Sequence, residues 1–460
     1  MKKIGFIIPD GTGIRNYLFS NIIPIINNKE IQIVLFHSIS DLALEEIKTV
    51  HSINFETYKI PTFNETIYQK FLREVVCYAR LLHNKELVNN ESILTNWNPS
   101  KKTFQKSLFY KLIEIVSKRI YNDYSKILKL EIKLNKSYEK KNRFYLKLLT
   151  KVKPSLLFST HQRAMNAIPL VSAAKQLKIK TIGAIFSWDN LPKARLTVKT
   201  DEYIVWSKYM NEELQLYYPE IDSKNITITG TPQFEFYTNS NYIMDKDFFY
   251  KKFSLDASKK TLCFSGDDLR TSPFDPNYLE DLAEIIQTEA LNFQLLLRRA
   301  PVDTSGRFDA VISKYPDIIK KVSPLWNFDR DDASNWQVIY PKYEDIELLI
   351  STAYYCDAVV NVGSTMAHDF AMFKKPAIYI NYNTVNSSSW DIETIYKFQH
   401  FKSIENLNPV LWLNSKQEIK ETLLIIDLEL KLDNEKWLNI IAEHRKTASV
   451  NIANTLISCI

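Results

Sequence analysis

One stretch of the sequence decides the fold class: Asp357-Ala-Val-Val-Asn-Val-Gly-Ser-Thr-Met-Ala-His-Asp-Phe-Ala-Met-Phe-Lys-Lys-Pro-Ala-Ile-Tyr-Ile380. Its spacing predicts a strand, a tight turn, a helix and a second strand. Residues 358–362 are apolar and mostly β-branched, as in a buried parallel strand. Gly363 permits a sharp turn, and Ser364 is a good N-cap for a helix that ends before Pro376. This pattern is typical of an α/β fold with a parallel sheet.

The turn of this stretch also suits an anion. A strand that feeds a helix through Gly363, Ser364 and Thr365 directs backbone N–H groups and the positive end of the helix dipole at one place, which fits a phosphate. Thr365 and Asp369 are four residues apart and share a helix face, so Asp369 could bind a ribose hydroxyl beside that phosphate. Taken alone, an ordinary crossover helix of an α/β sheet is the simpler interpretation.

Glycine is unusually scarce in this chain. There are only 8 among 460 residues, where average usage would give about 32. Glycines that persist against such a bias are expected where no other residue fits. Most of them directly follow apparent strands: Gly11, Gly13, Gly230, Gly266 and Gly363. In an open α/β sheet, that edge is where ligands bind.

The length and composition predict a soluble protein of two or three domains. Hydrophobic residues make up 45% and charged residues 24% of the chain, and no stretch approaches the ~20 apolar residues of a membrane span. Residues 1–10 are expected to form a first strand rather than a signal peptide. The cysteines are scattered without a CxxC pair, which fits a cytoplasmic protein and argues against a zinc cluster or a disulfide framework.

The first half opens with a predicted βαβ unit. Residues 3–8 form its first strand, and the following loop contains Gly11 and Gly13. This GxG pair is weak evidence for a dinucleotide, because the third glycine and the acid after the second strand are missing. A loop that lets substrate approach the backbone, with Asp10, Arg15 and Asn16 beside it, and a purely structural turn remain equal alternatives.

A helical and strongly basic insertion is expected at about residues 60–153. Residues 101–153 contain 16 Lys and Arg against 4 Asp and Glu, a local charge of +12 in a chain of +6. Leucine and isoleucine interleave with these cations. No nucleic-acid motif accompanies them, so a nucleic-acid partner is not expected. An anionic membrane surface suits a basic amphipathic helix better, and a solvated pair of lysine-rich helices is the plain alternative.

Strands and helices alternate again from residue 155. His161 follows a strand at 156–159, and Trp188, Asp189 and Asn190 follow one at 181–186. The carboxyl ends of parallel strands share one edge, so these side chains and Asp10 should face one crevice. His161 could be a general base or a loop histidine bound to backbone. Trp188 could stack on a sugar or base, or fill an interface.

The second half repeats the alternation after a linker predicted at 236–257. Ser265 and Gly266 follow its first strand, and Arg298 and Arg299 end its second. Two arginines at a strand end form a natural phosphate clamp, the alternative being a surface salt-bridge pair. We therefore divide the chain into residues 1–235, the linker, residues 258–430, and a C-terminal helix within 431–460 that packs back on the first half.

Two doubly wound halves with a closing helix resemble the GT-B glycosyltransferases. Phe186-Ser-Trp-Asp-Asn-Leu191, Ile204-Val-Trp-Ser207 and Ile228-Thr-Gly-Thr-Pro232 look like the first half of enzymes of this fold that build bacterial surface polysaccharides, such as capsule or O-antigen. Residues 356–369 and Lys375-Pro376 look like their donor-binding segment.

The resemblance implies a nucleotide-sugar donor in the second half and a glycan or lipid-linked acceptor in the first. The enzyme would lie in the cytoplasm or on the inner face of the cell membrane. It implies no cofactor and no catalytic metal, and Asp267-Asp268 and Asp331-Asp332 are weak metal motifs. Gly363, Ser364 and Thr365 would bind the phosphates and Asp369 the ribose, although many such enzymes have Glu there. Asp10 and His161 are the candidate catalytic bases.

Other functions remain open. A polyol-phosphate (CDP-glycerol-type) transferase related to teichoic-acid polymerases would share the two-domain layout and the donor loop. A non-catalytic protein that binds nucleotide sugars could keep the same fold. A sugar-nucleotide epimerase is the weaker alternative, because its set of acids is not recognisable in the sequence.

Overall fold

The computed structural model describes residues 2–140, 142–328, 339–384, 390–426, 428 and 430–460. The chain divides into two units. The first comprises residues 1–231, 398–400 and 447–460, and the second comprises residues 232–397 and 401–446. The predicted linker, residues 236–257, falls inside the second unit and contains a helix, α10 (Lys246–Lys252).

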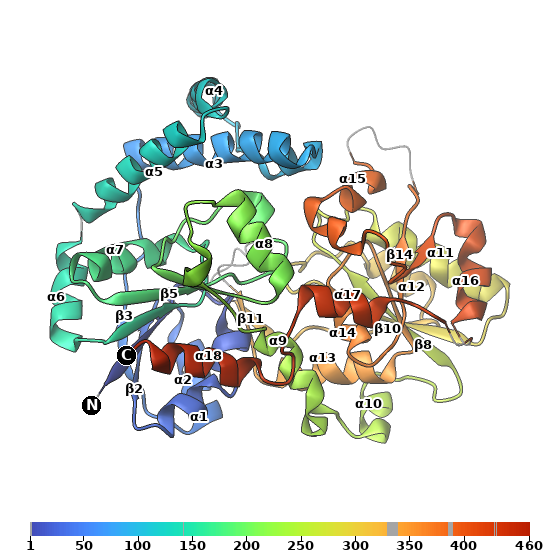
Figure 1. The fold of residues 1–460 in the computed structure, drawn as a ribbon. Helices are drawn as coiled ribbons and strands as arrows, with labels where there is room; N and C mark the ends of the chain where they lie inside the picture. Colours follow the sequence, from blue (N-terminus) through green and yellow to red (C-terminus); the bar gives the residue numbers. More distant parts are fainter. Residues whose placement is uncertain (1, 141, 329–338, 385–389, 427, 429) are drawn as a thin grey trace. The chain divides into compact units, whose positions relative to one another are not determined.

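The first unit is built on a parallel seven-stranded sheet in the order β3-β2-β1-β4-β5-β6-β7 (Figure 1). Its strands are β1 (Lys3–Ile8), β2 (Gln32–His37), β3 (Glu56–Lys59), β4 (Leu156–Ser159), β5 (Lys180–Ala184), β6 (Glu202–Val205) and β7 (Ile226–Ile228). The interior strand β1 is buried along almost its whole length, as a parallel strand covered on both faces should be. It pairs with β2 on one side and β4 on the other.

Short helices cover this sheet. They are α1 (Ile22–Asn27), α2 (Asp41–His51), α7 (Ile168–Gln176), α8 (Lys208–Tyr217) and α18 (Ala448–Ser458). The helix expected after the first strand is instead a π-helical turn, Ile14–Leu18, followed by α1. The last helix, α18, packs against α1 within the same unit.

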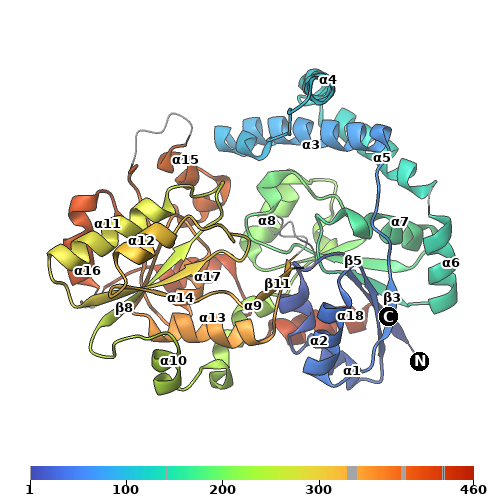
Figure 2. The same ribbon diagram turned by 180° about the vertical axis from the view of Figure 1, so that it is seen from behind.

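Long helices form the insertion between β3 and β4. They are α3 (Ile67–Val88), α4 (Phe104–Ile120), α5 (Tyr124–Glu139) and α6 (Arg143–Val152). Local sequence explains where they begin. Thr66 and Gln69 form a capping box at the start of α3, and the side chains of Thr103 and Asp123 cap α4 and α5. In both views, α4 lies on the outer side of the layer made by α3 and α5, away from the sheet (Figures 1 and 2).

The second unit repeats the design with a parallel six-stranded sheet in the order β10-β9-β8-β13-β14-β15. Its strands are β8 (Lys260–Gly266), β9 (Phe293–Arg299), β10 (Ile319–Lys321), β13 (Ala358–Asn361), β14 (Ala377–Ile380) and β15 (Leu411–Leu413). A separate antiparallel pair joins β11 (Trp326–Phe328) to β12 (Ile339–Pro341). The apolar run at residues 337–340 also predicts a strand, which begins among residues outside those described, and the acids at 331 and 332 lie outside them as well.

The helices of the second unit flank this sheet. Besides α10 they are α9 (Pro232–Glu235), α11 (Asp275–Thr288), α12 (Asp309–Lys314), α13 (Glu344–Tyr355), α14 (Met366–Ala371), α15 (Ile392–Tyr396), α16 (Ile419–Ile425) and α17 (Asn434–Ile441). The single C-terminal helix expected within residues 431–460 is instead two helices: α17 belongs to the second unit and α18 to the first.

Each sheet has one point where the strand order reverses direction. It lies between β1 and β4 in the first unit and between β8 and β13 in the second. Such a topological switch point opens a crevice at the carboxyl ends of the strands, where α/β proteins bind ligands. The predicted α/β class, with two Rossmann-like doubly wound units and a helical insertion in the first, is confirmed. No helix within the described residues is long and apolar enough to cross a membrane.

Candidate functional site

The switch point of the first sheet brings Asp10 and His161 together. Asp10 follows β1 and His161 follows β4, and their side chains are 5% and 7% exposed. His161 Nδ1 lies 2.9 Å from Asp10 Oδ2, and the Thr12 N–H donates to Asp10 Oδ1 at 3.1 Å. A carboxylate partner makes Nδ1 the donor, so in the neutral form of the ring Nε2 carries the lone pair. The pair can therefore present a proton acceptor at this edge.

Gly13 lets the loop after β1 approach β4. A Cβ atom on Gly13 would lie 2.7 Å from Thr160 Cβ, closer than any side chain tolerates. Thr160 is itself held in place, because its hydroxyl donates to the Ile7 carbonyl at 3.0 Å. Gly11 is buried nearby and its carbonyl accepts from the Ile14 N–H. Gly13 thus serves the approach of two strand ends, in line with the structural-turn alternative, whereas a contact of this loop with substrate stays a prediction.

Arg15 and Asn16 lie in the π-helical turn. Asn16 is buried, Arg15 is half-buried, and the Arg15 Nε–H donates weakly to Asn16 Oδ1 at 3.4 Å. Arg15 is therefore the more accessible of the two predicted acceptor contacts.

Trp188 and Asp189 follow β5 and are held by local contacts. Trp188 is 2% exposed, and its ring meets the His400 ring edge-on with 4.7 Å between centroids. The Ser187 hydroxyl donates to Asp189 Oδ1 at 2.7 Å, and Lys193 forms an ion pair with the other carboxylate oxygen. Burial opposes ionisation, but the Lys193 ammonium, the His400 ring and the Ser187 hydroxyl together outweigh it and hold the pKa of Asp189 well below its usual range.

Gln162 joins the His161 loop to this second loop. Its amide N–H donates to Asn190 Oδ1 at 3.3 Å, and its amide oxygen accepts from the Phe186 N–H at 2.9 Å. Arg163 donates to the same Asn190 oxygen, also at 3.3 Å. The sequence pointed to Asn190 but missed Gln162, whose position beside His161 was the only available signal. These contacts fix the backbone on which His161 stands.

The turn at the switch point of the second sheet has the conformation that its glycine predicts. Gly363 has φ of +66°, and a Cβ there would lie 3.0 Å from Phe401 Cζ and 3.1 Å from Ile395 Cγ2. The Ser364 N–H donates to Asn361 Oδ1 at 2.8 Å. Thr365, one residue further along, is exposed.

The helix after this turn corrects the prediction in one respect: Thr365, not Ser364, is the N-cap residue. The helix α14 ends at Ala371, before Pro376 as predicted, and Lys374 beyond it lies in the left-handed region at φ of 60°. Asp369 lies on α14 with its side chain buried, whereas Ser364 is half-buried.

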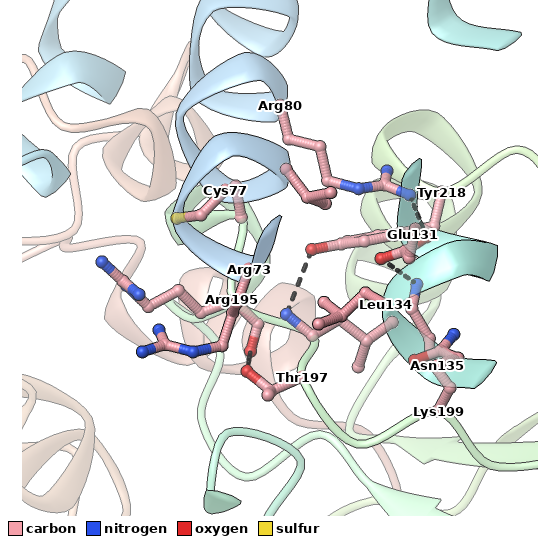
Figure 3. A pocket seen from close by; sticks show the side chains of 13 residues that line it. Arg73, Cys77, Arg80, Glu131, Leu134, Asn135, Arg195, Thr197, Lys199 and Tyr218 are labelled. Atoms are coloured by element: carbon pink, nitrogen blue, oxygen red, sulfur yellow. Dashed lines mark hydrogen bonds and ion pairs between the residues drawn. The ribbon is translucent and has the colours of Figure 1, made fainter. Parts of the chain in front are cut away.

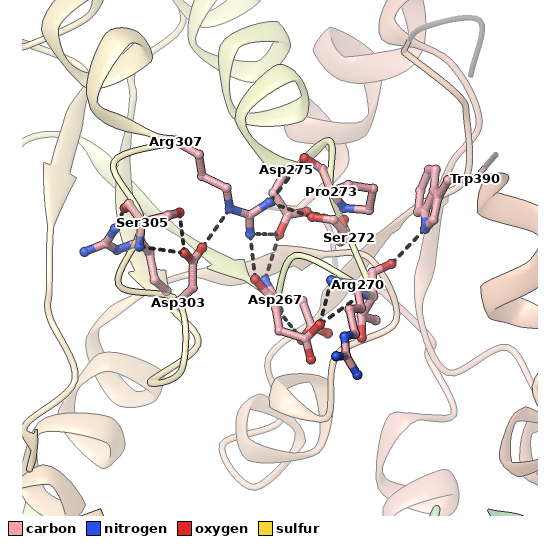
Figure 4. Close-up of polar contacts among 12 residues, drawn as sticks. Asp267, Arg270, Ser272, Pro273, Asp275, Asp303, Ser305, Arg307 and Trp390 are labelled. Atoms are coloured by element: carbon pink, nitrogen blue, oxygen red, sulfur yellow. Dashed lines mark hydrogen bonds and ion pairs between the residues drawn. The ribbon is translucent and has the colours of Figure 1, made fainter. Parts of the chain in front are cut away.

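A polar cluster supports the loops beside this turn (Figure 4). Ser265 and Gly266 end β8 and are buried. Directly after them, the Asp267 N–H donates to Asp275 Oδ2 at 2.7 Å. Arg307 donates to the Asp267 carbonyl at 2.6 Å and to Asp303 Oδ2 at 2.7 Å. One guanidinium thereby joins the loop after β8 to the loop after β9.

Two carboxyl groups of this cluster, those of Asp267 and Asp275, have raised pKa values. Burial raises the pKa of Asp275 to about 7, although the Ser272 hydroxyl and the Arg307 guanidinium oppose the shift. Burial and the neighbouring Asp268 carboxylate raise the pKa of Asp267 to about 7 as well. Asp267 and Asp275 therefore change protonation state near neutral pH.

Arg298 and Arg299 do not form the paired clamp that the sequence suggests. Arg298 is buried, and its Nη2 lies 2.9 Å from both carboxylate oxygens of Asp345. Asp345 also accepts from the Trp326 indole N–H at 2.8 Å. This buried network gives Arg298 a structural partner. Arg299 is half-buried and donates to the Ser305 carbonyl at 2.5 Å, so it remains the candidate phosphate contact.

A small pocket lies within the first unit, between the helical insertion and the loop at 194–199 (Figure 3). Its volume is about 30 Å³, room for about two water molecules. Arg80 on its wall pairs with Glu131 at 2.7 Å and with Glu220 at 3.0 Å. The pocket is too small for a nucleotide sugar, so we place no substrate in it. Across the described part of the chain, no group of three or more His, Cys, Asp or Glu side chains could hold a metal ion.

Comparison with known proteins identifies the fold of this chain but no family. No protein-family model matches this sequence, and no curated protein matches it. The structure is similar to the UDP-GlcNAc 2-epimerase of Neisseria meningitidis bound to UDP-GlcNAc, with 11% identity, a TM-score of 0.52 and coverage of 100% of both chains. The chain has the GT-B fold.

Two further structures agree over nearly the whole length. The UDP-GlcNAc 2-epimerase of Methanocaldococcus jannaschii is 12% identical with a TM-score of 0.53, covering 99% of each chain. The S. aureus MnaA–UDP co-structure is 11% identical with a TM-score of 0.51, covering 100% of this chain and 98% of that one. At such identities the likeness establishes the GT-B fold alone, and the chemistry must be argued from the residues of this chain.

Proposed function

We propose that this chain is a glycosyltransferase that moves a sugar from a nucleotide-sugar donor to a glycan or lipid-linked glycan in cell-surface polysaccharide synthesis. The observation that carries the proposal is the pairing of His161 with Asp10 at the switch point of the first sheet. UDP or UDP-GlcNAc is bound in solved structures of the same fold, which favours a uridine diphosphate sugar as the donor.

The chemistry assigns one task to each unit. In the first, His161 Nε2 takes the proton of an acceptor hydroxyl while Asp10 holds the ring and balances the imidazolium that forms. The acceptor oxygen then bonds to the anomeric carbon of the sugar, and the bond from that carbon to the phosphate oxygen breaks. Direct displacement of this kind inverts the anomeric configuration.

The second unit binds the donor. The departing diphosphate carries the electron pair and gains charge, so it needs hydrogen-bond donors that are already in place. The backbone N–H groups of the turn at Gly363, Ser364 and Thr365 and the guanidinium of Arg299 are suited to this role. Contacts of Ser265 and Gly266 with the phosphates and of Asp369 with the ribose belong to the same proposal.

Epimerisation is the second candidate function, because the structures named above include UDP-GlcNAc 2-epimerases. A 2-epimerase inverts the configuration at carbon 2 of the sugar of UDP-GlcNAc without an acceptor. A transferase needs an acceptor and releases UDP. A polyol-phosphate transferase would instead release a nucleoside monophosphate. The products therefore distinguish the three reactions.

The test incubates the full chain with UDP-, GDP-, CMP- and CDP-linked donors, with and without a lipid-linked glycan extract. We expect one donor to raise the thermal unfolding temperature, and release of its nucleoside diphosphate only when acceptor is present. If UDP-GlcNAc is converted without an acceptor, the chain is an epimerase and not a transferase. If a donor shifts the unfolding temperature but is not turned over, the chain is a binding protein.

A further inference from the structure

Helix α4 has one face that the protein covers and one that it does not. The covered face carries Tyr110, Ile113 and Ser117, which are buried against α3, where the Ser117 hydroxyl donates to the Val75 carbonyl at 3.0 Å. The opposite face points away from the layer formed by α3 and α5 (Figures 1 and 2). We refer to that opposite face as the outer face of α4.

Large apolar side chains line the outer face. Phe104 is 83% exposed, Leu108 49%, Leu112 48% and Ile115 40%. At about 100° per residue, the spacing of these four positions places them within an arc of about 80° of the helix. Single exposed apolar residues are common on soluble proteins, but a continuous stripe on one helix face indicates a surface that contacts something apolar.

Cations border the stripe and acids do not. Lys111 and Lys118 lie along one edge of it, and Arg119 lies among the apolar side chains. The only acid of α4, Glu114, is turned toward the covered side, where it accepts from the Trp97 indole at 3.0 Å and from Lys101 at 2.8 Å. The outer face therefore combines apolar groups with positive charge alone.

We propose that the outer face of α4 docks on an anionic lipid bilayer, with the helix lying in the plane of the interface. Apolar side chains then enter the acyl boundary while the flanking cations meet lipid headgroups, the arrangement of interfacial helices. A second copy of the chain is disfavoured as the occupant, because a symmetric contact would place the cations of both copies together. A nucleic acid would pair with the cations but leave the apolar stripe facing phosphates.

The inference rests on the proposed function in one respect: the bilayer is taken to be the one that contains the lipid-linked acceptor. Its test is flotation of the full chain with phosphatidylcholine vesicles, either pure or with about 30 mol% phosphatidylglycerol. We expect binding to the anionic vesicles that weakens with salt. The triple variant Leu108→Ser, Leu112→Ser, Ile115→Ser should bind about tenfold or more weakly.

The matched control removes three similarly exposed leucines elsewhere in the first unit: Leu42→Ser, Leu177→Ser, Leu216→Ser. It should float like the parent protein. The variant Lys111→Gln, Lys118→Gln, Arg119→Gln should lose the preference for anionic vesicles. Thermal unfolding verifies that each variant folds.

Three results would overturn the inference: no flotation of the parent protein, equal flotation of the two serine triples, or a loss of self-association rather than lipid binding in the α4 triple. Turnover on a water-soluble acceptor should be the same in the α4 triple and the parent. A failure of lipid binding can thus be distinguished from a failure of glycosyl transfer.

Discussion

His161 Nδ1 lies 2.9 Å from Asp10 Oδ2, although 151 positions separate the two residues in the sequence. The proximity follows from the pairing of β1 with β4, in which Ile7 is opposite Ser159. Both residues lie just beyond the carboxyl ends of those strands. In the proposed reaction, His161 is the proton acceptor and Asp10 orients its ring.

Removal of the imidazole should abolish most of the turnover. We expect His161→Ala to lower kcat by about 10²- to 10⁴-fold, the range for loss of a general base, with little change in donor KM. Steady-state kinetics with saturating donor measures this. Asp10→Asn should lower kcat by a smaller factor, because the amide oxygen can still accept from Nδ1.

The two residues should act as one unit. The double variant Asp10→Asn, His161→Ala is expected to be no slower than His161→Ala, since an orienting group has nothing to orient once the base is gone. If Asp10→Asn instead abolishes turnover while His161→Ala retains it, Asp10 itself is the base.

The two neighbouring arginines should behave differently when replaced. Arg298→Ala leaves Asp345 buried and uncompensated, so it should lower the free energy of unfolding by about 3–5 kcal/mol. Arg299→Ala should leave stability nearly unchanged but raise donor KM about tenfold or more, the cost of a charge-assisted contact. Thermal unfolding and donor kinetics on the same preparations measure both. A strong loss of stability in Arg299→Ala would remove it from the donor site.

The turn at Gly363 should not tolerate a side chain. Gly363→Ala forces an L residue into the left-handed region, which costs about 1–2 kcal/mol, and crowds Phe401 and Ile395. We expect a lower unfolding temperature and weaker nucleotide binding. Gly306→Ala is the control: its Cβ would meet only the flexible end of Asp309, at 2.9 Å from Oδ2. Equal effects of the two substitutions would contradict the role of the turn.

The acids beside Arg307 predict a pH dependence of stability. Burial raises the pKa of Asp275 to about 7, whereas an unfolded aspartate titrates near about 3.9. Between these values the native state binds more protons than the unfolded state, so stability falls as pH rises through about 7. Above that pH the full cost of the buried charge is present.

Asp275→Asn should reduce this dependence, because its amide can keep the contacts with Ser272 and the Asp267 N–H without a charge. The difference in unfolding temperature between about pH 5.5 and pH 8 should shrink in this variant, and stay as in the parent in the exposed control Asp317→Asn. An unchanged difference in Asp275→Asn would show that Asp275 does not titrate in this range.

Transfer should also persist without divalent cations. We expect EDTA to leave turnover unchanged, because the proposed donor site uses backbone N–H groups and Arg299 to meet the diphosphate charge. Loss of activity in EDTA, restored by Mg²⁺ or Mn²⁺, would assign a metal to the reaction.

Strong local patterns made much of the fold predictable. The strands at Lys3–Ile8 and Ala377–Ile380 have the predicted bounds, because buried apolar runs are legible in sequence. The strand at Leu411–Leu413 was missed, since three residues are too few to show a period. A single helix was predicted within residues 431–460 because the break at Ala442, which is extended, carries no glycine or proline.

The positions of the candidate site residues were predictable where the strand order of the sheet determines them. Asp10 and His161 were expected at one sheet edge because parallel strands end there together. Pairing of Arg298 with Asp345 was not predictable, since it depends on how α13 packs 47 residues further along the chain. The anchoring of the His161 loop by Gln162 depends likewise on side-chain directions that no sequence pattern encodes.

Helix α18 has a consequence for synthesis. It packs on α1, and its Asn451 donates to the Thr229 carbonyl at 3.3 Å, so the first unit is assembled from segments that flank the second. A ribosome releases residues 447–460 only after the whole second unit has been translated. Domains fold as units while the chain emerges from the ribosome. The second unit can therefore finish folding before α18, which completes the first unit, has been synthesised. The surface of α1 that α18 covers therefore stays exposed to solvent during that interval.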